Sequence, residues 1–159
     1  MDATDFLVRE ISNRMLRLLG NAEQSLGQLD EGQVWYRAHP RDNAIGNLIL
    51  HIVGSFQGVL GGIDGKPVAR NRSAEFSATQ GKSKDELTSI LRETIEELCR
   101  VIESVPAARI SAAIRIQDIE TTIACVLVGA VSHLSVHVGQ MQFIAKSLLQ
   151  EAYKESSHA

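Results

Sequence analysis

The chain has 159 residues, of which 44% are hydrophobic, 22% are charged and 4% are aromatic, and its formal net charge is −3. This length suits a single domain with its own core, expected over residues 1–159, and the shortage of aromatic side chains favours packed aliphatic helices. No basic patch offers a footprint for nucleic acid, and no apolar run approaches the ~18 residues of a membrane span, so we expect neither partner.

The N-terminal segment and the cysteines indicate a cytoplasmic protein. Residues 1–10 are acidic and amphipathic, unlike a signal peptide. Cys99 and Cys125 lie inside expected helices and lack the spacing of a zinc motif. We therefore expect two buried thiols in a reducing compartment.

Apolar residues at helical spacing predict two long helices in the first part of the chain. The first covers residues 4–29. A connector over residues 31–41 follows, because a proline forbids a continuous helix there. The second helix begins at Asp42 or Asn43, either of which is a suitable cap, and ends at the glycine pair 61–62.

A long loop separates the second helix from the third. Residues 63–82 contain several Gly, Pro, Asn and Ser residues, which predict a loop of a length that is often functional. Ser83 and Glu86 then match the S-x-x-E capping box that opens a helix, and Pro106 ends that helix.

The last part of the chain combines an extended segment with a fourth helix. Residues 109–118 alternate apolar and other side chains, as a strand does, although no partner strand is evident. The fourth helix is expected from residues 120–122 to about Tyr153. Four long amphipathic helices predict an all-α fold, a four-helix bundle with a long loop between its second and third helices.

Three histidines lie within the expected helices. His133 and His137 are four residues apart and so point the same way from the fourth helix. His137 falls in an apolar seam, which predicts a core position: Leu127, Ala130, Leu134, His137, Met141, Ile144 and Leu148. His51 lies on a polar or small strip of the second helix: Asn47, His51, Gly54 and Gly58. If the histidines converge, they make a divalent metal site; the alternative is ordinary core histidines with one hydrogen bond each.

Two polar residues could support such a site from behind. Asn47 lies one turn before His51, and Gln140 lies three residues after His137, so each could hydrogen-bond near the ligands. An ordinary buried polar contact explains them equally well. His39, beside a proline in the connector, is expected to be exposed.

The spacing also limits the chemistry. A metalloprotease needs a glutamate directly after the first histidine of the pair, and Leu134 occupies that place. Glu75 and Glu120 are possible general bases, but neither is fixed in space by the sequence. Catalytic residues therefore stay unassigned, and the lack of a clear base puts hydrolysis in doubt.

Three segments of the chain resemble the DinB/YfiT-like superfamily. NAIGNLILHIVG, residues 43–54, is similar to its second helix, and HLSVHVGQMQFIAK, residues 133–146, is similar to its closing H-x-x-x-H-x-G-Q helix. RNRSAEF, residues 70–76, resembles the R-x-R-x-x-E-F stretch of one uncharacterised branch. The segments follow one another in the order and spacing of that superfamily over nearly the whole chain.

The resemblance implies an up-down-down-up bundle, usually a homodimer, whose three histidines hold a divalent ion, often nickel or zinc. Carried onto this sequence, the metal ligands are His51, His133 and His137. Spare apolar surface at Val59, Leu60 and Val126 would serve the homodimer.

The resemblance also implies two classes of function. Some relatives are thiol-dependent transferases or isomerases, so one expectation is a thiol S-transferase-like enzyme that uses a low-molecular-weight thiol or another small-molecule substrate. The alternative is a metal-binding or stress-related structural or interaction protein without turnover.

Overall fold

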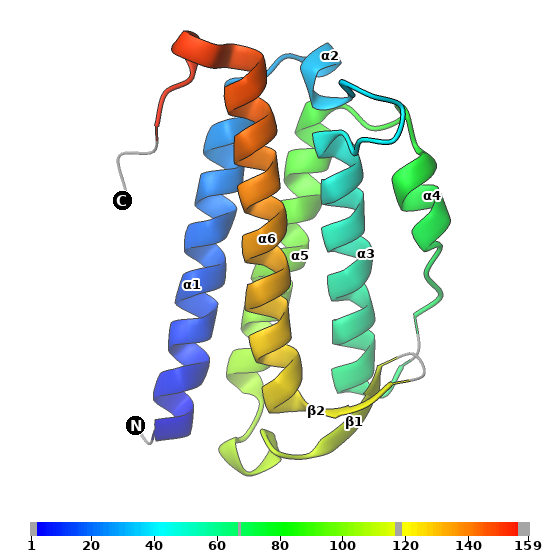
Figure 1. Cartoon of the computed structure of the whole chain (residues 1–159). Helices are drawn as coiled ribbons and strands as arrows, with labels where there is room; N and C mark the ends of the chain where they lie inside the picture. The colour runs from blue at the N-terminus through cyan, green and yellow to red at the C-terminus, as the bar shows by residue number, and fades with distance from the viewer. Residues whose placement is uncertain (1–2, 67, 117–118, 156–159) are drawn as a thin grey trace.

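The computed structural model of the chain describes residues 3–66, 68–116 and 119–155. Four long helices lie side by side and make up most of the molecule (Figure 1). They are α1 (Ala3–Leu26), α3 (Ile45–Asp64), α5 (Lys84–Ser104) and α6 (Ile123–Leu149). In Figure 1, α1 and α6 run upward, whereas α3 and α5 run downward. The fold is thus mostly helical, as predicted.

Short elements fill the connections between the long helices. They are α2 (Glu31–Val34), α4 (Arg72–Ser77), the 3-10 turns Ala107–Arg109 and Gln150–Ala152, and the strands β1 (Ala113–Ile116) and β2 (Ile119–Thr122). The expected loop 63–82 therefore contains a helix of its own, α4, which lies beside α3 (Figure 1).

The helix ends show which local signals are reliable. At α5 the predicted capping box is confirmed: the Ser83 side chain accepts from the Glu86 N–H, and the Glu86 carboxylate accepts from the Ser83 N–H. At α3 the predicted caps Asp42 and Asn43 are wrong, because the helix begins at Ile45 and its N-cap residue is Ala44. The Ala44 N–H donates to the Asn47 side chain at 3.0 Å.

The extended segment has a partner strand that we did not predict. β1 pairs with β2 in antiparallel orientation, and residues 117–118 between them lie outside the described residues. The expected start of the last helix at 120–122 is therefore wrong. β2 contains three β-branched residues, which favour a strand, and Thr122 then caps α6 by accepting from the Cys125 N–H.

The four long helices share one apolar core. Its fully buried side chains come from every one of them, for example Met15 of α1, Phe56 of α3, Leu98 of α5 and Leu134 of α6. Two details differ from expectation. Val59 and Val126 are 8% exposed and belong to this core, so they are not spare surface.

The seam of α6 departs from its prediction at its most important position. Leu127, Ala130, Leu134 and Met141 are buried, as expected. His137 is only half-buried, and Val138 occupies the core position beside it. The histidine therefore lies at the edge of the core, within reach of solvent. Cys99 is buried as predicted, but Cys125 is exposed, so the expectation of two buried thiols is wrong for Cys125.

Two helices of the described residues, α3 and α6, are long and apolar enough to cross a membrane by length and composition alone. This is weak evidence, because core helices of soluble proteins have the same character. α3 fits that explanation, with 61% of its apolar window buried, whereas the window in α6 is 33% buried.

Candidate metal centre

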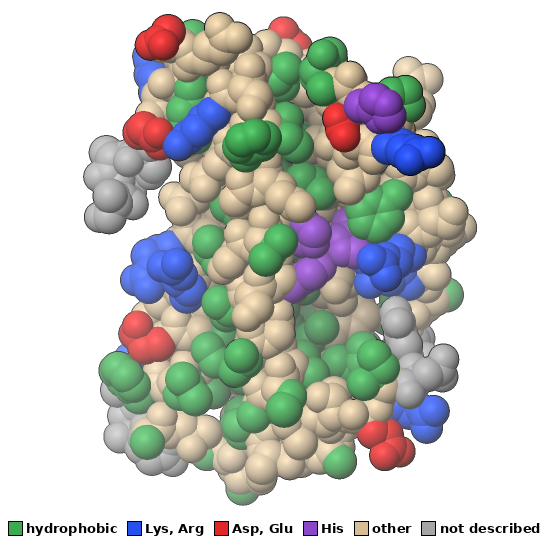
Figure 2. Space-filling model, viewed as in Figure 1, with side chains coloured by type: hydrophobic (Ala, Val, Ile, Leu, Met, Phe, Trp, Pro, Cys, Tyr) green, Lys and Arg blue, Asp and Glu red, His purple; other side chains and the backbone are tan. Residues whose placement is uncertain are grey.

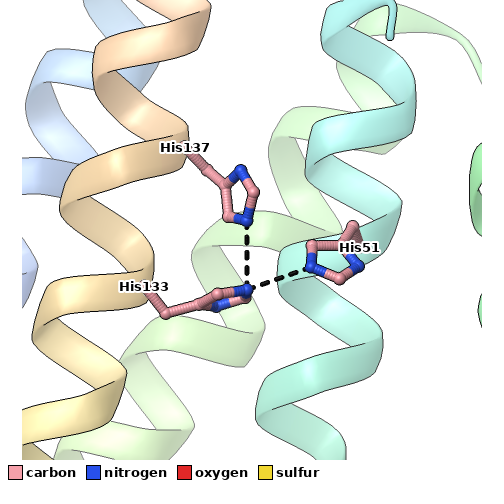
Figure 3. A group of neighbouring side chains, drawn as sticks. All are labelled: His51, His133 and His137. Carbon is pink, nitrogen blue, oxygen red and sulfur yellow. Dashed lines mark hydrogen bonds between the residues drawn. The ribbon is translucent and has the colours of Figure 1, made fainter.

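Three histidines converge between α3 and α6. His51 comes from α3, and His133 and His137 come from α6 (Figure 3). The Nε2 atom of His133 lies 3.0 Å from the Nε2 atoms of both His51 and His137. In Figure 2 histidine side chains reach the surface between these two helices. The predicted candidates are thus brought together at one solvent-facing point.

The spacing of the three nitrogens suits a single divalent ion. Imidazole nitrogens about 2.1 Å from a common ion lie roughly 3.0–3.4 Å apart at coordination angles of about 90–110°. The two 3.0 Å separations fall in that range. Three protein ligands would leave at least one coordination position open, as in catalytic rather than structural zinc sites.

A buried ion pair binds the Nδ1 side of His51, opposite the Nε2 atom that faces the other histidines. Glu75 of α4 places Oε2 at 3.1 Å from His51 Nδ1, and Arg70 binds the same carboxylate through both of its oxygens, at 2.7 and 2.8 Å. A Cβ atom at Gly54 would collide with the Glu75 carboxylate, so this position of α3 must be glycine for Glu75 to approach. Gly54, one of the small residues on the strip of α3 that carries His51, therefore leaves room for the Glu75 carboxylate.

The hydrogen-bond partners of His51 Nδ1 indicate which of the two ring nitrogens carries the hydrogen and which presents a lone pair to the other histidines. Arg70 Nη2 lies near three acceptors, Glu75 Oε2, the His51 carbonyl and His51 Nδ1, but it carries only two hydrogens. If those hydrogens go to the two oxygens, His51 Nδ1 carries its own hydrogen and donates it to Glu75. His51 Nε2 then presents a lone pair to the other histidines, the tautomer that binds a metal.

The other two rings differ in their support. His137 Nδ1 lies 2.7 Å from Gln140 Oε1, an acceptor, so its hydrogen is on Nδ1 and its Nε2 also presents a lone pair. His133 Nδ1 is buried and has no hydrogen-bond partner among the described residues. With His51 and His137 in these tautomers, the lone pairs of their Nε2 atoms both point toward His133 Nε2. A cation at their meeting point would bind the Nε2 atoms of all three rings.

Burial lowers the pKa of His51 and His133, which keeps these two rings ready to bind a metal at neutral pH. Desolvation, together with the charges of His137, His51, Arg70 and Arg72, lowers the pKa of His133 to about 4. Desolvation also lowers the pKa of His51, against the opposing effect of its hydrogen bond to Glu75. Burial alone would raise the pKa of Glu75, but hydrogen bonds from Arg70 and His51 hold it below its usual value. Neutral imidazoles beside an ionised carboxylate are the protonation states that metal binding requires.

Comparison with known proteins gives a family but no activity. A family model described as "Protein of unknown function (DUF1572)" matches residues 2–158. The chain belongs to the DUF1572 family. No curated protein matches it. A solved structure of a conserved protein from Enterococcus faecalis is similar, with a TM-score of 0.76 and 14% identity over 92% of this chain and 96% of that chain. At this identity the likeness concerns the fold alone.

In this DUF1572 protein, Asn47 acts on the site indirectly, through its hydrogen bonds to α4 and the residue that follows it. Its amide donates to the carbonyls of Glu75 and Ala78, at 2.9 and 2.7 Å, and its Oδ1 accepts from Arg37 at 2.8 Å. Arg37 also donates to the carbonyls at the end of α4. None of these bonds reaches a histidine. Asn47 and Arg37 therefore fasten α4 to α3, and α4 in turn carries Glu75.

Two further candidates lie apart from the histidines. His39 is exposed in the connector, where its ring accepts from the Arg41 N–H. Glu120 is exposed in β2, at the lower end of the molecule in Figure 1. Sequence reasoning had no signal for Arg37, which lies in a connector. The pairing of Arg70 with Glu75 was open to prediction from the spacing in RNRSAEF, but its contact with His51 was not.

Proposed function

We propose that this chain is a divalent-metal-binding protein in which His51, His133 and His137 hold one ion within a four-helix bundle of the DinB/YfiT-like kind. The observation that carries the proposal is the convergence of three Nε2 atoms, two of them on rings whose Nδ1 atoms are engaged from behind. The opposed directions of the four long helices support the same fold.

Nickel or zinc is the proposed ion. Three neutral imidazoles suit both metals, whereas calcium and magnesium prefer oxygen ligands. Glu75 does not compete for the ion, because its two oxygens are bound to Arg70 and His51.

The proposed activity is that of a thiol S-transferase-like or isomerase-like enzyme with a low-molecular-weight thiol as partner. An ion in this site would supply a Lewis acid that lowers the pKa of a bound thiol. Glu75 is tied into an ion pair and Glu120 lies on the hairpin, so neither is placed as a free general base for hydrolysis. Thiol chemistry would need no such base, because a thiol bound to the ion would release its proton to solvent.

A metal-binding protein without turnover is the second candidate. His51 and His133 are 82 residues apart in the chain, so an ion between them would tie α3 to α6. On our proposal the shared apolar core keeps the bundle folded without that tie. On our proposal, chelator-treated protein keeps its helical circular dichroism and melts only modestly lower. A collapse to random coil would instead identify a structural ion and remove the main support for the open, catalytic site.

Metal content and thiol response test the proposal together. Protein purified without added metal should contain about one equivalent of nickel or zinc, and His137→Ala should lose it while the exposed-histidine control His39→Ala keeps it. Addition of a thiol to cobalt-substituted protein should change the visible spectrum. Full metal loading of His137→Ala would contradict the site, and an unchanged spectrum with intact loading would favour the protein without turnover.

Assembly as a homodimer is also proposed, through α6. This helix has no Asp, Glu, Lys or Arg between Ile123 and Ala145. It nevertheless leaves Val128 60% exposed. A second copy would cover this apolar surface. Light scattering should give a dimer for the native chain and a monomer for Val128→Glu; a native monomer at micromolar concentration would contradict the proposal. We also propose that the protein is cytoplasmic and has neither a membrane nor a nucleic acid as partner.

A further inference from the structure

A pocket of about 850 Å³ lies beside the histidines. It is formed by the connector after α2, the first turn of α3 and the second half of α6. Gln140 lines it, and the same side chain binds His137 at 2.7 Å. The volume falls within the roughly 300–1,000 Å³ of small-molecule sites, so the space suits a small organic ligand.

One side of the pocket is unusually apolar for an exposed surface. Val136 and Phe143 of α6 line it and are 58% and 72% exposed. Tyr36 lines it from the connector and is 51% exposed. Large apolar side chains left in contact with water around a concavity mark a surface that a ligand covers.

The other side of the pocket carries two guanidinium groups. Arg37 is fixed by bonds from Nη2 to Asn47 and to two backbone carbonyls, and Arg41 lies four residues further on. Among the residues that the structure describes, neither arginine forms an ion pair. Asp42 is the one carboxylate among the lining residues, so the lining has an excess positive charge. Guanidinium groups bind planar oxyanions through two parallel hydrogen bonds, and Arg41 can supply both of them. Arg37 has its Nη2 engaged and its Nε buried, so it contributes mainly positive charge.

We infer that this pocket binds a small organic anion, with its carboxylate or phosphate at Arg41, close to the positive charge of Arg37, and its apolar body against Tyr36, Val136 and Phe143. This goes beyond the proposed function, because the pocket residues are present whether or not the histidines hold an ion. Gln140 joins the two features: a ligand in the pocket touches the side chain that orients His137. Bound anion therefore lies next to the candidate metal centre and is sensed by it.

Simple probes test the charge and the apolar wall separately. Hexanoate, hexyl phosphate and the neutral hexanamide are titrated into full-length, metal-free protein by isothermal calorimetry. One charge-assisted contact changes binding by about tenfold or more, so at least one anion should bind about tenfold more tightly than the amide. The ratio between hexanoate and hexyl phosphate identifies the carboxylate or the phosphate as the preferred head group. Equal affinity of all three probes would overturn the inference.

Two variants place the binding in this pocket. Arg41→Ala should weaken the preferred anion about tenfold and leave hexanamide unchanged. Gly139→Leu fills the pocket, since a Cβ atom at Gly139 meets nothing within 4 Å, and should weaken every probe. Gly20→Leu is the matched control, an exposed helix glycine on α1 with the same open space. Binding unaffected by Arg41→Ala or by Gly139→Leu would overturn the assignment.

The oligomeric state distinguishes a ligand site from an interface. Light scattering on the same variants should show the native assembly. If Gly139→Leu and Arg41→Ala change the assembly and the native protein binds no probe, a second copy covers this surface and the inference fails. Metal content is measured on the same variants before the metal is removed, so failure of the anion site with intact metal loading leaves the metal proposal standing, and the reverse result leaves the anion site standing.

Discussion

The two histidines that flank His133 are held in different ways. His51 is buried, and its far nitrogen meets Glu75, which is itself gripped by Arg70 inside the protein. His137 is half-buried, and its far nitrogen meets Gln140, an exposed amide. A charged, desolvated partner restricts a ring more than a neutral, solvated one. The α3 side is therefore the fixed wall of the site, and the α6 side is the wall that can adapt to a ligand.

The largest expected effect comes from removing the ring that both walls share. His133 touches the other two histidines, so His133→Ala should abolish stoichiometric metal binding while helical circular dichroism is retained. Elemental analysis after gel filtration measures this. Ser135→Ala on the same helix is the control, and it should bind metal as the native chain does.

Weakening the fixed wall should have the next largest effect. Glu75→Gln keeps the shape of the side chain but removes the charge that binds Arg70 and His51. Loss of such a carboxylate behind a ligand typically lowers metal affinity about 10–100-fold. Competition with a chromogenic chelator gives the affinity, with Glu120→Gln as the control. Equal affinities of the two variants would show that Glu75 does not position His51.

The glycine beside His51 offers a steric version of the same test. Gly54→Ala forces Glu75 away, and overpacking of this kind costs about 1–3 kcal/mol of unfolding free energy. Gly58→Ala, one turn further along α3, meets open space and should be neutral or stabilising by up to about 1 kcal/mol. Urea unfolding of both variants measures the contrast, and similar losses at the two positions would count against a tightly fitted Glu75.

Acid should destabilise the metal-free protein through the same buried rings. The pKa of His133 is about 4 in the folded chain against 6.5 for an unperturbed histidine, so the unfolded chain binds the extra proton first as the pH falls. Unfolding free energy should therefore drop by on the order of 2 kcal/mol between pH 7 and pH 5, with little change above pH 7. Urea titrations follow it, and His133→Gln should flatten the dependence. A native profile as flat as that of the variant would contradict this account.

The adaptable wall should tolerate change best. Gln140→Ala removes one neutral, exposed hydrogen bond to His137, which is worth about 1 kcal/mol or less. Metal affinity should fall only a few-fold in the chelator competition. A loss as large as that of Glu75→Gln would erase the difference between the two walls.

Much of this organisation was predictable because it is local and periodic. Helical spacing located the four long helices, and the Ser83–Glu86 box located one helix start to the residue. The pair His133 and His137 followed from spacing alone, since residues four apart share a helix face. Their meeting with His51 depends on how two helices pack, and only the structure brings the rings to 3.0 Å.

The remaining features depend on contacts between distant segments. β2 was taken for the start of a helix because its pairing with β1 is invisible in a four-residue segment. The role of Glu75 depends on a fold of the loop that brings α4 against α3, and that fold rests on Asn47 and Arg37. His137 was placed in the core because a period of three and four residues cannot tell a buried seam from its half-buried edge.

The attachment of α4 has a consequence for local opening of the protein. α4 is six residues long and is held to the rest of the chain by carbonyl bonds to Asn47 and Arg37 and by the contacts of Glu75 and Phe76 with His51. A segment with so few anchors opens at a lower free energy than the core helices, and its amide hydrogens exchange earlier. Each opening removes Glu75 from His51 while α3 and α6 stay folded. The exchange rate of the α4 amides thus reports how often the contact between Glu75 and His51 is broken.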